Sequence, residues 1–310
     1  MEERIEIMNL LQNKHILEHE LQTLLYGSVE IRENNSNKYI YVHYREDGVA
    51  LTKYVGEYSD ELYNLVLNNS IKAKQLKKQI REITKKLKQL NYTEEELSEK
   101  VAQNIDFAKR HLVDTIYKQA ILEGVATTFA DTESIIEGGK VNNMTSEDVM
   151  KIVNLKHAWE FILNKNVILS DTNFALLCEI NKMVEEGFYY TAGKVRNTPV
   201  TIGGTTWKPD LPIESVIKED LEGIFNKELN DVDRAIELLL YTMKKQVFID
   251  GNKRTAVIYS NHYLISKGKG IIAIPAELTE EFKDLLIPYY EGKDENKIKK
   301  FIKEKCYTSI

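Results

Sequence analysis

Residues 245–256 read Lys-Gln-Val-Phe-Ile-Asp-Gly-Asn-Lys-Arg-Thr-Ala. An apolar helical run, residues 235–243, leads into this stretch, and a second helical run, residues 255–264, leads out of it. The short loop between the two predicted helices therefore holds a carboxylate, a glycine, an amide and two cations.

These residue types are those of an anion-binding loop. A glycine-containing loop that opens a helix directs backbone N–H groups at one point, where the helix dipole favours negative charge. Gly251 permits close backbone approach or a positive φ angle. Arg254 presents a planar fork suited to phosphate oxygens, and Lys253 adds a point charge. Asp250 is the kind of ligand that Mg²⁺ takes when it also holds phosphates. The alternative is a capped helix with a solvated charge cluster.

The stretch also resembles the signature of the Fic/Doc family, which reads His-Pro-Phe-x-[Asp/Glu]-Gly-Asn-x-Arg-Thr-x-Arg. Members typically move AMP, or sometimes another phosphate-containing group, onto a hydroxyl of a target protein. The resemblance implies that Asp250 holds Mg²⁺, and that Asn252 and Arg254 hold the phosphates of ATP with Gly251 and Lys253 beside them. The matching residues are Phe248, Asp250, Gly251, Asn252, Arg254 and Thr255.

The departures from the signature bear on chemistry. Gln246 stands at the position of the catalytic histidine, Val247 at that of the proline, and Val257 at that of the second arginine. Lys253 with Ala256 resembles the Doc branch, which also lacks the second arginine. Glutamine donates and accepts hydrogen bonds but does not titrate. Losing a general base typically costs about 10²–10⁴-fold in rate, whereas positioning and electrostatics carry most of phosphoryl-type transfer.

His262 does not replace the missing base. It follows Arg254 by eight residues, which sets it about 12 Å further along the helix at a rise of about 1.5 Å per residue.

Residues 131–139, Asp-Thr-Glu-Ser-Ile-Ile-Glu-Gly-Gly, resemble the self-inhibitory helix of the family, [Ser/Thr]-x-x-x-Glu-[Gly/Asn]. Glu137 falls on the inhibitory glutamate, and Glu133 replaces the hydroxyl residue. In relatives this glutamate pairs with the second signature arginine. Because that residue is Val257 here, we hypothesise that Glu137 turns to Arg254 instead. The alternative is an ordinary helix ended by glycines.

Residues 193–196 and 200–207, followed by Pro209 and Pro212, predict two short strands around a turn. The resemblance makes this segment the flap over the active site, which pins the target's backbone by strand addition. An ordinary surface hairpin is the alternative. The predicted flap residues are Thr201, Ile202, Gly203 and Gly204.

The first third of the chain lies outside the resemblance. Its pattern predicts a helix over residues 1–26, a β-hairpin from strands 39–44 and 51–55, and a helix over 59–90 with a lysine-rich second half. We take the lysines as a solvated face, with a docking surface as the alternative. Residues 93–96 predict a capping-box start. We therefore expect an N-terminal region, residues 1–94, and a Fic domain, residues 95–310.

Composition limits the class of protein. The chain has 310 residues, 43% apolar and 29% charged, which is typical of globular proteins, and a formal charge of −6, which argues against nucleic acid as a partner. Two cysteines, Cys178 and Cys306, and no apolar run of membrane-spanning length favour a cytoplasmic protein without membrane contact. Further helices are expected at 146–164, 170–186, 213–229, 231–244, 279–290 and 295–306.

The expected fold is mainly α, a Fic-type helical core with a β-hairpin flap. Three functions remain open. The first is ATP–Mg²⁺ binding with slow AMP transfer to an unidentified target protein. The second is a non-catalytic nucleotide sensor, and the third a Doc-like protein kinase. A homo-oligomer is left open.

Overall fold

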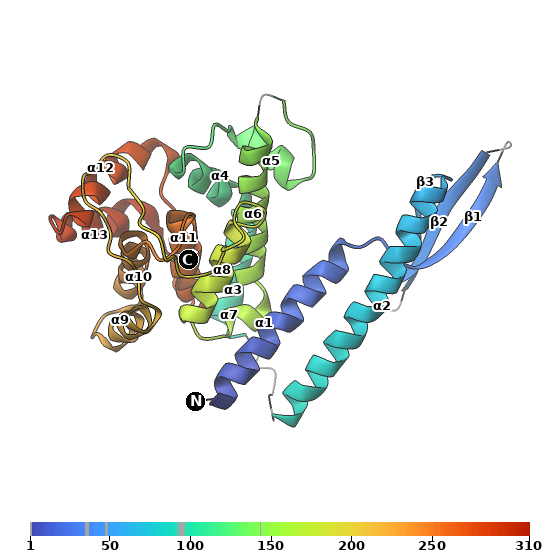
Figure 1. Cartoon of the computed structure of the whole chain (residues 1–310), viewed down its shortest axis with the longest axis horizontal. Helices are drawn as coiled ribbons and strands as arrows, with labels where there is room; N and C mark the ends of the chain where they lie inside the picture. Colours follow the sequence, from blue (N-terminus) through green and yellow to red (C-terminus); the bar gives the residue numbers. More distant parts are fainter. Residues whose placement is uncertain (1, 35–36, 47–48, 91, 93–96, 143) are drawn as a thin grey trace. The chain divides into compact units, whose positions relative to one another are not determined.

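The computed structural model describes residues 2–34, 37–46, 49–90, 92, 97–142 and 144–310 (Figure 1). By internal contacts the chain divides into two compact units, Met1–Glu94 and Glu95–Ile310.

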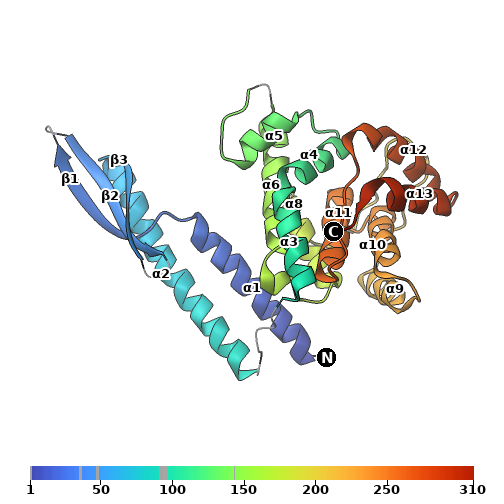
Figure 2. The same cartoon turned by 180° about the vertical axis from the view of Figure 1, so that it is seen from behind.

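The N-terminal unit consists of two helices and one antiparallel sheet (Figures 1 and 2). Helix α1 (Glu2–Thr23) packs along α2 (Asp60–Gln89), and strands β1 (Ser28–Asn34), β2 (Asn37–Glu46) and β3 (Val49–Glu57) lie in the order β1-β2-β3. The predicted hairpin is thus part of a three-stranded sheet. Strand β1 was missed because only Val29 and Ile31 in it are apolar. These two residues face Val42 and Ile40 of β2.

Helix α2 begins at the N-cap Ser59, whose side chain accepts from the backbone N–H of Leu62. Leu76 and Leu87 are buried as the helical spacing predicts, whereas Leu65 is 55% exposed. The lysines of the second half lie at exposed positions of the helix. The capping box predicted at residues 93–96 lies outside the described residues, and the next helix begins after Ser98.

The C-terminal unit is a helical bundle with one small two-stranded sheet, so the prediction of a mainly α fold is confirmed. Its elements are α3 (Glu99–Arg110), α4 (Leu112–Leu122), α5 (Phe129–Ile136), α6 (Ser146–Ile162), α7 (Lys165–Ile168), α8 (Phe174–Val184), α9 (Glu214–Asn226), α10 (Asp231–Lys245), α11 (Asn252–Ser266), β4 (Ile271–Ile272), a 3₁₀ turn (Ala276–Leu278), α12 (Thr279–Tyr290), α13 (Glu295–Phe301), a π-helical turn (Ile302–Cys306) and β5 (Tyr307–Thr308).

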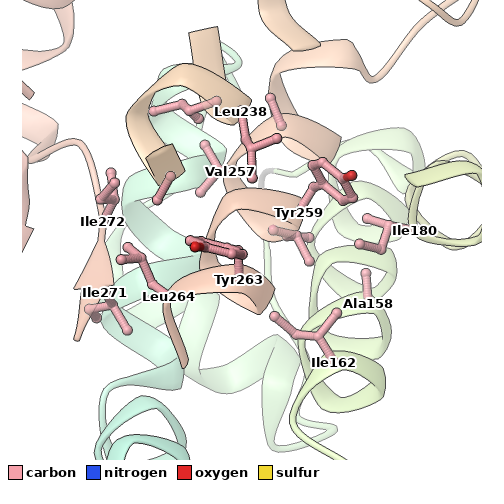
Figure 3. Close-up of a cluster of buried hydrophobic side chains, with 14 of the residues drawn as sticks. Ala158, Ile162, Ile180, Leu238, Val257, Tyr259, Tyr263, Leu264, Ile271 and Ile272 are labelled. Carbon is pink, nitrogen blue, oxygen red and sulfur yellow. The ribbon is translucent and has the colours of Figure 1, made fainter. Parts of the chain in front are cut away.

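Helix α11 lies at the centre of this unit. All its residues except Lys253 and Ser266 are buried. It packs against α6, α8, α10 and β4, and Figure 3 shows side chains from these elements around Val257, Tyr259 and Leu264. A helix that is buried on all sides cannot shift easily. The loop that precedes α11 is therefore held in one place.

Some boundaries differ from the predictions. The helix predicted from Ser170 begins after Asn173, whose side chain accepts from the backbone N–H of Leu176 and so caps it better than Ser170. The short helix α7 precedes it. Strand β5 pairs antiparallel with β4, a partner that the sequence did not predict. Among the described residues, no helix is both long enough and apolar enough to cross a membrane.

Candidate active site

The loop between α10 and α11 is bracketed by two left-handed residues. Gln246, the C-cap of α10, has φ 49° and ψ 59°, and Gly251, the N-cap of α11, has φ 72°. Left-handed backbone costs a non-glycine residue about 1–2 kcal/mol, so neighbouring groups must hold Gln246. Its carbonyl accepts from Arg196 Nε at 2.6 Å, and its amide donates to the carbonyl of Met243 at 2.6 Å.

Asn252 closes the loop from inside. Its Nδ2 donates to the Phe248 carbonyl at 2.8 Å and to Gln246 Oε1 at 3.2 Å, while its Oδ1 accepts from the backbone N–H of Phe248 at 2.9 Å. The side chain is buried, and both its amide hydrogens already have acceptors. The amide of Asn252 therefore fixes the loop, and the phosphate contact that the resemblance implies for Asn252 stays a prediction.

Arg254 lies among carboxylates. Its Nη2 is 2.7 Å from Glu185 Oε1 and 3.7 Å from Asp250 Oδ1, and its Nε is 3.6 Å from Glu123 Oε2. Lys253 Nζ lies 3.3 Å from Glu123 Oε1. Arg254 is only 2% exposed, so these pairs are shielded from solvent.

Glu185 follows α8 and is 1% exposed. Burial raises the pKa of its carboxyl to about 7, although the Arg254 guanidinium acts to lower it and Asp250 and Glu123 act to raise it. Burial, with the nearby charges of Asp250 and Glu185, also raises the pKa of Tyr189.

The residues present fit a phosphate-bearing ligand. Among the described residues, Nε and Nη1 of Arg254 are buried without a hydrogen-bond partner, and such groups ordinarily have one. Helix α11 begins without a side-chain cap. The side chain of Asp250 is 50% exposed, and its Oδ1 accepts from the backbone N–H of Gly251 at 2.7 Å.

A metal would need further ligands. In the described part of the chain, no group of three or more His, Cys, Asp or Glu side chains is placed to hold a metal ion. Asp250 therefore fits Mg²⁺ only together with oxygens supplied by the ligand, which is how Mg²⁺ is commonly held.

Side chains from α4 and α8 hold the loop and the start of α11 by hydrogen bonds. Gln119 of α4 donates to the Arg254 carbonyl at 2.7 Å and is itself held by Trp159 of α6. Asn181 of α8 donates to the Asp250 carbonyl at 3.0 Å and to Thr255 Oγ1 at 3.1 Å. The sequence alone did not predict these residues or Glu185, because no local pattern marks contacts between segments 69 or more residues apart.

The segment predicted as a two-stranded flap forms no strands; it is an irregular loop with a turn at residues 203–204. The extended parts of this loop do not pair with any strand that the structure describes. Instead, Gly204 with φ 83° lies against Ile287 of α12, and Thr205 donates to Glu291 at 2.8 Å. Trp207 stacks on Tyr290 with ring centroids 5.7 Å apart. The remaining predicted flap residues, Thr201, Ile202 and Gly203, lie in the same loop.

Arg196 connects this irregular loop to the loop between α10 and α11, residues 246–251, which we call the signature loop. Besides the Gln246 carbonyl, its guanidinium donates to the carbonyls of Thr198 at 2.8 Å and Asp210 at 2.7 Å. Its own backbone N–H donates to Val247 at 3.0 Å. The buried side chain of Arg196 therefore holds the irregular loop next to Gln246.

Glu137 is exposed at the end of α5, where Gly138 adopts φ 79°. The ion-pair partners of Arg254 among the described residues are Glu185, Glu123 and Asp250, and the inhibitory role that the resemblance implies for Glu137 stays a prediction. His262 is buried against Thr172 and the Val167 carbonyl, away from the loop.

Residues 171–264, which include α8, the signature loop and most of α11, match the model of the Fic/DOC family. The chain carries a Fic/DOC family domain. Solved Fic structures resemble the fold. Fic-1 from C. elegans is 17% identical, with 79% of this chain and 77% of that chain covered and a TM-score of 0.53. A Fic family protein from Desulfovibrio desulfuricans is 12% identical, with 68% and 73% covered and a TM-score of 0.52.

A Fic domain-containing signaling protein from Bacteroides thetaiotaomicron is 18% identical, with 61% of this chain and 75% of that chain covered and a TM-score of 0.50. At such identities the likeness establishes the Fic fold alone. No curated protein matches the chain. The Fic/DOC family generally transfers AMP or other nucleotidyl groups to proteins.

Proposed function

We propose that this Fic domain binds the phosphates of ATP–Mg²⁺ at residues 250–254 and transfers AMP to a hydroxyl of a target protein at a reduced rate. One observation carries the proposal. Among the described residues, two nitrogens of the buried Arg254, Nε and Nη1, donate no hydrogen bond, and they lie beside the start of α11, which has no side-chain cap. Cationic donors that retain hydrogen-bonding capacity at a helix N-terminus favour an anion such as a phosphate.

Each residue of the loop has a role in this proposal. Arg254 and the first backbone N–H groups of α11 bind phosphate oxygens, with Lys253 beside them, and Asp250 is the protein ligand of Mg²⁺, which supplies charge neutralisation at the phosphates. Gly251 lets the backbone approach. We further propose that the loop holding residues 201–204 contacts the target, because Arg196 fixes it beside Gln246.

In the reaction the hydroxyl oxygen of the target forms a bond to the α-phosphorus of ATP. The bond between the α-phosphorus and the oxygen that bridges it to the β-phosphorus breaks, and pyrophosphate is released. The hydroxyl proton passes to a solvent water or to the released pyrophosphate in the same step. Gln246 does not titrate, so no group at the family's histidine position accepts the proton. We expect a rate about 10²–10⁴-fold below that of an enzyme with its base.

A second candidate is a nucleotide sensor that performs no transfer. The bonds of Gln246 favour it, because its amide donates to the Met243 carbonyl and accepts from Asn252 at 3.2 Å. A Gln246 side chain held in this way stabilises the conformation of the loop.

Incubation with α-³²P-ATP and, separately, γ-³²P-ATP in a cell lysate separates the candidates. Protein label from the first nucleotide indicates AMP transfer, label from the second alone indicates a kinase, and binding without label indicates the sensor. Gln246→His is the companion variant. A gain of AMP transfer would show that only the base is missing, and no gain would contradict the transferase proposal.

A further inference from the structure

We infer that Glu185 is an internal competitor of phosphate, a carboxylate that occupies the place at Arg254 which a ligand phosphate would take. The inference rests on the proposed function and adds a regulatory contact to the same site. It assigns to Glu185, the C-cap of α8, an inhibitory role like the one that the family resemblance implies for Glu137.

The position of Glu185 is that of a bound anion. Its Oε1 lies 2.7 Å from Arg254 Nη2. A Cβ built on Gly251 would lie only 2.3 Å from the same oxygen, so the carboxylate fills the space directly beside the N-cap residue of α11. One oxygen therefore lies beside both a guanidinium and a helix N-terminus, the two features that favour an anion.

Glu123 acts on the other cation of the loop. It lies at the end of α4, 3.3 Å from Lys253 Nζ and 3.6 Å from Arg254 Nε. With Asp250, three carboxylates thus face two cations. A phosphate that entered this cluster beside Glu185 would add like charge in a shielded place, which disfavours it. It must displace the Glu185 carboxylate from Arg254 or find it neutral.

The remaining bonding capacity of the cluster shows that the internal contacts do not complete the site. Among the described residues, Nε and Nη1 of Arg254 are buried and donate no hydrogen bond, although Nε lies 3.6 Å from Glu123 Oε2. A pair made for structure alone ordinarily satisfies such atoms. Arg254 therefore retains donors for a second anion, and exchange of Glu185 for a phosphate would use them.

The test is the affinity for ATP–Mg²⁺, measured by calorimetry on the full chain. Glu185→Gln keeps the size of the side chain and removes its charge. We expect the variant to bind at least about tenfold tighter than wild type. Glu186→Gln changes the next residue, which is exposed, and is the matched control; its affinity should equal that of wild type. Thermal melting of each variant shows that it is folded.

Glu123→Gln is the second variant, in case Glu185→Gln does not fold. It releases Lys253 and Arg254 from the other carboxylate, and it should also tighten binding. Inorganic pyrophosphate, titrated in parallel, separates phosphate recognition from recognition of the rest of the nucleotide and should show the same order of affinities.

Each outcome decides a different claim. Tighter binding by Glu185→Gln, or binding by this variant alone, supports both the inference and the proposed function. Equal affinity of wild type and both glutamine variants overturns the inference and leaves nucleotide binding intact. No binding of ATP–Mg²⁺ or pyrophosphate by any of the folded proteins overturns both.

Discussion

At the scale of single residues, Gly251 shows how backbone and packing act together. Its φ of 72° strains any other L-residue, and a Cβ there would collide with Glu185. We predict that Gly251→Ala lowers the free energy of unfolding by about 1–3 kcal/mol, the usual cost of a strained backbone. Urea denaturation followed by circular dichroism measures this change.

Gly223 in α9 provides the matched control. Its backbone has no positive φ, and a Cβ there would meet nothing within 4 Å. Gly223→Ala should leave stability unchanged or raise it by about 0.5–1 kcal/mol, because alanine favours helix. Equal effects of the two substitutions would contradict the account of Gly251.

The chemical roles of the loop residues were predictable from the sequence, but the residues that contact them were not. The order of Phe248, Asp250, Gly251 and Arg254 predicted an anion site because each residue type carries a chemical property. Glu185 and Arg196 lie 50 residues or more away from Arg254 and Gln246, the loop residues that they hold. Nothing local distinguishes Glu185 from Glu186, of which one is buried and the other exposed.

At the scale of elements, Arg196 joins the irregular loop to the signature loop. We predict that Arg196→Met leaves three backbone carbonyls without their donor and lowers the free energy of unfolding by about 3 kcal/mol, at about 1 kcal/mol for each lost bond. Limited proteolysis should then cut within residues 198–210 sooner than in wild type.

Lys194→Met is the control for this variant, since Lys194 is exposed two residues away. Its cleavage rate should match that of wild type. If Arg196→Met were as resistant to protease as Lys194→Met, the guanidinium would not hold the loop.

Helices were more predictable than strands at this scale. Apolar periodicity and N-caps such as Ser59 and Thr145 are local signals, whereas a strand needs a partner that the sequence does not name. The segment around Gly203 therefore shows turn residues without forming a ladder, and the short strand β5 pairs with β4 across a gap of 34 residues.

At the scale of the whole C-terminal unit, His262 couples folding to pH. It is fully buried, and burial lowers its pKa from 6.5 to about 4. Between these values the unfolded chain binds a proton that the native protein does not. The contribution of His262 to stability is therefore complete above pH 6.5 and is lost as pH falls through 4, by about 3 kcal/mol at 1.36 kcal/mol per pKa unit.

Measurement of unfolding free energy at pH 7, 5 and 4 tests this prediction. Glu185 acts in the opposite sense: its raised pKa makes the native protein bind more protons from about pH 4.5 to 7, so its contribution falls as pH rises. The difference between wild type and His262→Gln isolates the histidine. A difference that does not change with pH would contradict the assignment.

Calorimetric titration of ATP–Mg²⁺ into the wild-type protein and into Arg254→Lys tests the central claim, that residues 250–254 bind a triphosphate. Lysine keeps the charge but loses the fork, and melting curves establish that the variant is folded. The account predicts saturable heat with wild type and at least about tenfold weaker binding with Arg254→Lys. Equal affinity of the two proteins, or no heat with wild type and with Glu185→Gln alike, would contradict it.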